Sequence, residues 1–141
     1  MSEDRLFLDT VFVQALLNTR DQCHTQAHAL LPRIRVAGEV RVTDAVLLDV
    51  GNALCAINRV DAAAFIRRCY DTVNIHVVHL DPALLDRSLA MYESRADKTW
   101  SLTDCMSFVV MGDHGVTDAA TATSTSAWLA SVPSSWIRRN L

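Results

Sequence analysis

The sequence lacks the features of secreted, membrane-spanning or zinc-stabilised proteins. Its four cysteines form no Cys-x-x-Cys pair, and each lies among apolar or small residues, as buried free thiols do. The first residues are polar and acidic, unlike a secretory signal, and no apolar run approaches the roughly 18 residues that a membrane span requires. We therefore expect a soluble protein of the cytoplasm, with reduced cysteines and no membrane anchor.

Basic residues are also scarce. The 141 residues include 13 Lys and Arg against 16 Asp and Glu, which gives a formal net charge of −3. This balance argues against a broad cationic surface for nucleic acid, so any such contact should be local. Half of the residues are hydrophobic, enough for a core of ordinary size. We expect a single domain that spans residues 1–141.

Short apolar runs alternate with segments of helical periodicity. The expected strands are 6–8, 40–43, 74–80 and 116–122, with a short fifth strand at 136–137. The expected helices are 10–17, 21–35, 44–58, 62–70, 82–94 and 101–113. The segment 121–135, rich in Ser, Thr and Ala, reads as a surface loop with a weak final helix. The alternation predicts an α/β sandwich with a mostly parallel sheet.

Three aspartates are set among apolar residues. Asp9 follows the first expected strand, Asp49 interrupts the helix after the second, and Asp104 lies in the first turn of a later helix. A lone buried carboxylate is costly, and three brought together by folding lower that cost by sharing a divalent cation. In open α/β sheets, sites form where the strands end. The pattern therefore predicts a metal-dependent phosphodiesterase.

Each of these residues also has a purely structural interpretation. Asp104 with Ser101 has capping-box spacing, Asp9 could be a solvated strand end, and Asp49 could face solvent. His24 and His28 have the spacing of a zinc pair, but no third ligand is evident and a solvated helix face is favoured.

Possible supporting residues lie near the three acids. Thr10 could hold a metal-bound water or a phosphate through its hydroxyl, and Asn52 could orient Asp49. Trp100 reads as a packing residue, with stacking on a base as the alternative. The nearest candidates for phosphate contacts, each more typical of a solvated surface charge, are Arg20, Lys98, Arg138 and Arg139.

Three segments carry a resemblance to a known family: 7–22, 45–54 and 97–108, which contain Phe7-Leu8-Asp9-Thr10, Leu48-Asp49-Val50-Gly51-Asn52 and Ser101-Leu102-Thr103-Asp104. The chain resembles, over nearly its whole length, a PIN-domain ribonuclease of the VapC-like type found in bacterial toxin–antitoxin pairs. The resemblance implies a three-layer α/β domain with a central, mostly parallel sheet flanked by helices. It also implies that Asp9, Asp49 and Asp104 bind Mg²⁺ or Mn²⁺ and are catalytic.

The sequence departs from the family pattern at two acids. Asp49 is one methylene shorter than the usual Glu, so a water could bridge it to the metal. The family's fourth acid falls at Thr123, which has no carboxylate. Asp97 or Asp118 could compensate, although both read as residues of exposed turns, and Thr123 could contribute a hydroxyl. We expect weakened activity.

The resemblance implies that RNA is the substrate, that a cognate antitoxin occupies a groove near the acids, and that the chain forms a homodimer. The expected reaction is attack by a metal-activated water that leaves a 5′-phosphate and a 3′-hydroxyl. A second hypothesis is a catalytically degenerate PIN domain that serves as a binding or regulatory module. A phosphohydrolase with Asp9 as nucleophile ranks last, because that chemistry typically needs an acid where Val11 stands.

Overall fold

Strands and helices alternate along the chain, as the sequence predicts. The computed structural model describes residues 3–122 and 127–131. Its strands are β1 (Arg5–Leu8), β2 (Glu39–Thr43), β3 (Ile75–Val78), β4 (Asp118–Ala122) and β5 (Ala127–Ser131). Its helices are α1 (Thr10–Leu17), α2 (His24–Ala29), α3 (Leu31–Val36), α4 (Asp44–Leu54), α5 (Arg59–Asp71), α6 (Pro82–Ser94) and α7 (Leu102–His114).

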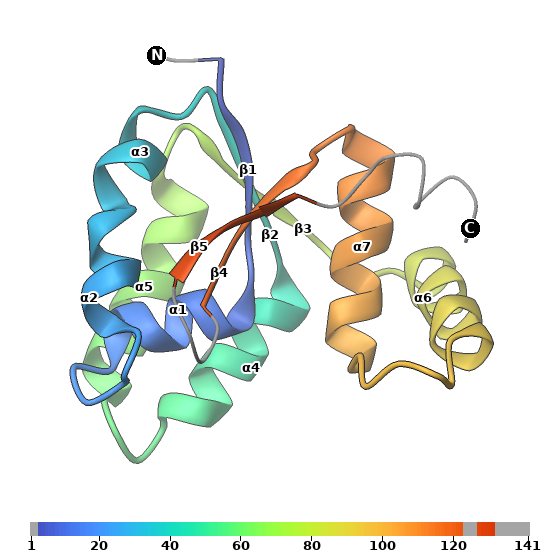
Figure 1. Cartoon of the computed structure of the whole chain (residues 1–141), viewed down its shortest axis with the longest axis horizontal. Coiled ribbons are helices and arrows are strands. Elements are labelled where there is room, and N and C mark those ends of the chain that lie inside the picture. Colours follow the sequence, from blue (N-terminus) through green and yellow to red (C-terminus); the bar gives the residue numbers. More distant parts are fainter. Residues whose placement is uncertain (1–2, 123–126, 132–141) are drawn as a thin grey trace.

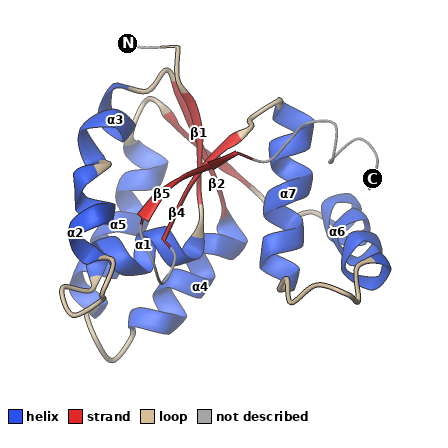
Figure 2. Ribbon diagram, viewed as in Figure 1, coloured by secondary structure: helices blue, strands red, loops and turns tan. Residues whose placement is uncertain are grey.

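The strands form one sheet in the order β3-β2-β1-β4-β5. Strands β3, β2, β1 and β4 are parallel, and β5 pairs antiparallel to β4 at the edge. Helices α6 and α7 lie on one side of the sheet, and α1, α2, α3 and α5 lie on the other (Figures 1 and 2). The expected three-layer architecture with a mostly parallel sheet is confirmed.

The central strand β1 is covered on both faces. Leu6, Phe7 and Leu8 are all fully buried, although consecutive residues of a strand point to opposite faces. A strand with helices on both sides needs such a continuous apolar run. Burial of β1 therefore fixes the position of the next residue, Asp9, at the end of the central strand.

Local capping rules account for the starts of several helices. The Thr43 hydroxyl accepts a hydrogen bond from the Val46 N–H at the start of α4, and Asp81 caps α6 just before Pro82. Helix α7 begins with the predicted capping box and ends at Gly115, whose positive φ of 64° favours glycine.

The helix expected at 21–35 is instead two helices, α2 and α3. Asp21 does not cap a helix: its carboxylate accepts the Cys23 N–H at 2.8 Å and closes a turn before α2. Pro32 has no N–H to continue α2, and it is accommodated in the first turn of α3. Helix α4 is also shorter than expected, because it ends at Leu54 and not near residue 58.

The polar segment 121–135 is not the loop with a weak helix that its composition predicts, because its described residues lie in strands. Residues 127–131 form β5, which pairs with β4 from Asp118↔Ser131 to Ala122↔Ala127. Hydrogen bonding to the edge of β4 stabilises this strand, a contact that local composition does not reveal. The strand expected at 136–137 lies outside the described residues.

None of the four cysteines, all of which lie in the described ranges, forms a disulfide, and Cys23, Cys69 and Cys105 are buried as expected. Cys55 is exposed just beyond α4, which corrects the expectation for that residue. None of the helices in the described ranges has the length and apolar character of a membrane-spanning segment.

Candidate functional site at the carboxyl edge of the sheet

Two of the predicted acids lie at one edge of the sheet. Asp9 directly follows β1. Helix α7 leads into β4. The first residue of β4 pairs with Leu6, near the amino-terminal end of β1 and thus near the sheet edge opposite Asp9. The 13-residue α7 is about 20 Å long, so its first turn, which contains Asp104, returns to the edge where β1 ends (Figure 1). The fold therefore brings Asp9 and Asp104 to the same end of the sheet.

Asp9 occupies the junction between β1 and α1. Its N–H donates to the carbonyl oxygen of Ala120 at 3.1 Å, which ties the junction to β4. Its backbone has the extended conformation of a helix N-cap, yet its side chain makes no capping hydrogen bond to α1. The half-buried carboxylate is thus not engaged in capping its own helix.

Thr10 presents an unsatisfied polar atom beside Asp9. Its hydroxyl oxygen is buried and has no hydrogen-bond partner among the described residues. Buried hydroxyls are usually hydrogen-bonded, and leaving one unpaired costs about 1–3 kcal/mol. A hydroxyl left in this state next to a carboxylate fits a site completed by a water or a phosphate oxygen.

Asp104 is held in place by the capping box of α7. The Ser101 N–H donates to Oδ2 of Asp104 at 2.9 Å, and the Asp104 N–H donates to the Ser101 hydroxyl at 3.0 Å. The box uses one carboxylate oxygen and leaves Oδ1 outside it. Asp104 can therefore combine the capping role with metal binding.

Asp49 lies half-buried in the second turn of α4, and Asn52 is exposed one turn further on. No hydrogen bond connects their side chains within the described part of the protein. The orienting role expected of Asn52 is thus not observed.

Asp44, the first residue of α4, is a further acid directly after a strand of the sheet. In the structure, Thr43 caps α4, and the Asp44 carboxylate accepts the Leu80 N–H at 3.0 and 2.9 Å through its two oxygens. His79 Nδ1 lies 3.7 Å from the same carboxylate. Asp44 thus connects the start of α4 to the chain that follows β3. Asp44 directly follows β2, as Asp9 follows β1, and this position is the sequence signal that could have identified it as a residue of this edge.

The donor set fits a hydrated cation better than a closed cage. Within residues 3–122 and 127–131, no group of three or more His, Cys, Asp or Glu side chains is placed to hold a metal ion together. The three-carboxylate convergence expected from the sequence is therefore not assembled. Mg²⁺ commonly keeps several waters and needs only one or two carboxylates. Of the three predicted acids, Asp9 and Asp104 are the two that the fold brings to the same end of the sheet.

The residues proposed to replace the fourth acid do not join this set. Asp97 is exposed and pairs with Arg95 at 3.2 Å, and this hydrogen bond lowers the pKa of Asp97. Asp118 is not on an exposed turn: it is the half-buried first residue of β4, and it lies 3.8 Å from Arg33. Because Asp118 pairs with Leu6, it lies near the opposite edge from Asp9 and cannot compensate. Thr123 lies outside the described residues.

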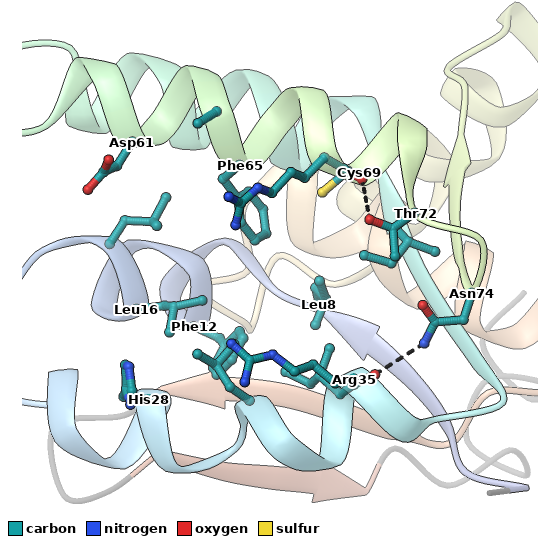
Figure 3. Close-up of a pocket in the computed structure, with 16 residues that line it drawn as sticks. Leu8, Phe12, Leu16, His28, Arg35, Asp61, Phe65, Cys69, Thr72 and Asn74 are labelled. Atoms are coloured by element: carbon teal, nitrogen blue, oxygen red, sulfur yellow. Dashed lines mark hydrogen bonds between the residues drawn. The ribbon is translucent and has the colours of Figure 1, made fainter. Parts of the chain in front are cut away.

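A cavity of about 510 Å³ lies between α5 on one side and α1 and α3 on the other (Figure 3). Phe12 and Leu16 of α1 face Phe65 of α5 across it, and Arg35 of α3 also lines it. Burial raises the pKa of the lining thiol Cys69 to about 12, so this thiol is neutral at physiological pH. The cavity is suited to apolar groups rather than to thiolate chemistry.

Comparison with known proteins shows a likeness to solved structures. No family model and no curated protein matches the sequence. Among solved structures, the crystal structure of Mycobacterium tuberculosis VapC20, a Sarcin-Ricin loop cleaving toxin, matches with a TM-score of 0.75 and 24% sequence identity. The match covers 84% of this chain and 90% of that one. The chain is therefore an α/β protein with the PIN-like fold of the VapC20 toxin.

Proposed function

We propose that this protein is a metal-dependent endoribonuclease that acts as the toxin of a toxin–antitoxin pair. The observation that carries the proposal is the unsatisfied Thr10 hydroxyl beside Asp9, at the sheet edge to which Asp104 returns. The PIN-like fold shared with a Sarcin-Ricin loop cleaving toxin supports the same assignment.

Asp9 and Asp104 would hold Mg²⁺ or Mn²⁺ directly. Asp49 would contribute through a bridging water, because its side chain is one methylene shorter than that of the usual Glu. Such a cation, when bound, polarises a phosphate oxygen and lowers the pKa of a coordinated water. The Thr10 hydroxyl donates a hydrogen bond to a phosphate oxygen or to a water. Ser101 keeps the Asp104 carboxylate in a fixed orientation through the capping box. No side chain becomes covalently attached to the RNA, and the products are a 5′-phosphate and a 3′-hydroxyl.

The cognate antitoxin would occupy the cavity between α1, α3 and α5. The apolar side chains of Phe12, Leu16 and Phe65 favour an apolar segment of the partner, and Arg35 favours a carboxylate on that segment. Assembly of the chain as a homodimer stays a prediction.

The nuclease is tested with purified chain free of antitoxin, mixed RNAs, and reactions with and without Mn²⁺. We expect metal-dependent cleavage that is lost in Asp9→Asn and in Asp104→Asn. Asp71→Asn is the matched control, because Asp71 is exposed at the end of α5, close to the start of β3 and thus near the opposite sheet edge. Equal cleavage by all four proteins would show that a contaminating nuclease is responsible.

The second candidate is a catalytically degenerate PIN domain that binds a partner. It is favoured by the absence of a three-ligand metal group in the described residues and of an acid at position 123. In that case wild-type protein cleaves no RNA even with excess Mn²⁺, whereas Thr123→Asp gains metal-dependent cleavage. Cleavage by the wild type excludes this candidate.

A further inference from the structure

The loop between α6 and α7 forms a second hollow next to the acidic edge. Its volume is about 570 Å³, and the residues that line it include Tyr92, Arg95, Lys98, Trp100 and Ser101. Ser101 is also the residue whose N–H donates to the carboxylate of Asp104. The hollow is therefore contiguous with the first turn of α7.

Trp100 provides a fixed aromatic surface in this hollow. The indole is half-buried and packs edge-to-face on Phe108 of α7, with 5.0 Å between ring centroids and an interplanar angle of 65°. Edge-to-face packing restrains the ring, which also lines the hollow. An indole fixed in this way can stack on a base with little loss of side-chain entropy.

Two cations lie over the Trp100 ring. The Arg95 guanidinium carbon is 5.5 Å from the ring centroid, and the Lys98 ammonium is 5.9 Å from it. Arg95 also hydrogen-bonds to Asp97. Lys98 is exposed, and it is the single lysine of an acidic chain. Two of the chain's 13 basic residues thus lie in the hollow next to the first turn of α7.

An aromatic ring with adjacent cations is the usual combination for binding single-stranded nucleic acid. Stacking on the ring tolerates any base, and the cations neutralise the flanking phosphates. RNA whose scissile phosphate lies at Asp104 would extend over Trp100, four residues earlier in the chain. An RNA contact here is also local, as the net charge of −3 requires.

We propose that this hollow binds a nucleotide of single-stranded RNA that flanks the scissile phosphate, with its base on Trp100 and its phosphate against Lys98. The inference rests on the proposed ribonuclease function and assigns the substrate-positioning residues of that site. Lys98 leaves the indole ring to meet the phosphate, and it breaks no side-chain hydrogen bond among the described residues when it does so.

The test is binding of a fluorescein-labelled single-stranded RNA to the full chain in EDTA, so that no cleavage occurs. We expect Trp100→Ala to weaken binding by about tenfold or more and Trp100→Phe to retain most of it. Lys98→Gln should make the slope of log K against log salt concentration shallower by about one. Unchanged affinity in Trp100→Ala and unchanged salt dependence in Lys98→Gln would overturn the proposal.

A second measurement does not depend on the folding of the Trp100 variants. RNA with a periodate-oxidised 3′ ribose forms an imine with a nearby amine, and cyanoborohydride reduces it to a stable link. We expect the RNA to be linked to Lys98, and Lys98→Arg to lose the link while still binding RNA. Linkage only to the amino terminus would overturn the proposal.

The two hypotheses can fail separately. Binding that depends on Trp100, without cleavage in Mn²⁺, refutes the nuclease and leaves the RNA site standing. Metal-dependent cleavage that is equally efficient in wild type and Trp100→Ala, with equal binding, refutes the RNA site and leaves the nuclease standing.

Discussion

Ser101 and Asp104 each accept a hydrogen bond from the backbone N–H of the other, at 2.9 and 3.0 Å. This reciprocal contact starts α7 and orients the carboxylate at the same time. Stability and catalysis therefore depend on one residue pair, and substitutions at the two positions should separate the two roles.

Asp104→Asn preserves an oxygen that can accept the Ser101 N–H, so the free energy of unfolding should change by less than about 1 kcal/mol. The same substitution removes a charged metal ligand, and RNA cleavage should fall on the order of a hundredfold or more. Ser101→Ala should show the reverse, with a loss of about 1 kcal/mol in stability and a smaller loss of cleavage. Urea denaturation and Mn²⁺-dependent cleavage measure both effects. Equal stability losses in the two variants would contradict this division of roles.

Thr10→Val should lower cleavage without destabilising the protein. Valine has nearly the shape of threonine and removes a buried hydroxyl that has no partner among the described residues. We expect the unfolding free energy to be unchanged or higher by about 1 kcal/mol, and cleavage to fall by about tenfold. Thr10→Ser, which keeps the hydroxyl, is the control and should retain most of the cleavage. Destabilisation by Thr10→Val of more than about 1 kcal/mol would mean that the hydroxyl is satisfied within the folded chain.

Glu39 should make the fold sensitive to acid. Burial alone would raise the pKa of its carboxyl, but hydrogen bonds from Arg5 and Arg41 outweigh burial, and the pKa lies below its ordinary value of 4.5. A lowered pKa in the folded state stabilises the protein above the pKa of the unfolded chain. This contribution is lost as the pH falls from about 4.5 through the folded-state pKa.

Glu39→Gln should therefore reduce the unfolding free energy at pH 7 by about 1–2 kcal/mol and flatten its fall in acid. Some loss of stability in acid should remain in Glu39→Gln. The hydrogen bond from Arg33 lowers the pKa of Asp4, so Asp4 also stabilises the fold less as the pH falls. Denaturation at pH 7 and pH 3.5 provides the comparison. A variant that loses stability in acid as steeply as the wild type would exclude Glu39 as a source of the effect.

The sequence predicted the central strand and the acid that follows it because both depend on local signals. An apolar run that ends in Asp9, and Ser and Asp three residues apart before α7, are each readable within a few positions. The parallel direction of β1, β2, β3 and β4 then follows from the alternation of strands and helices. The position of Asp9 and the capping geometry of Asp104 were therefore predictable.

Other features depend on contacts between distant segments. Strand β5 is stabilised by pairing with β4. The sequence does not show at which end of the sheet Asp118 lies, because that depends on the register of its pairing with Leu6. The role of Asp44 depends on the Leu80 N–H, 36 residues away. No periodicity or local motif encodes these pairings between distant segments.

The four cysteines should differ sharply in reactivity towards a thiol reagent at pH 8. Cys55 is exposed just after α4, whereas the other three are buried. Burial raises the pKa of Cys69 to about 12, so only roughly one part in ten thousand of that thiol is ionised at pH 8. Burial and the charge of Asp104 also raise the pKa of Cys105. We expect Cys55 to react rapidly and the three buried thiols to react far more slowly.

Cys55→Ser should abolish the fast phase, and peptide mapping of the modified wild type should locate the label at Cys55. A fast phase that persists in the variant and maps to Cys69 would contradict the closed packing of α5 over the cavity. Because Cys69 lines that cavity, its rate of modification reports directly on access to it. An antitoxin segment bound in the cavity should slow the modification of Cys69 further and leave Cys55 unaffected, provided that the partner does not cover the end of α4.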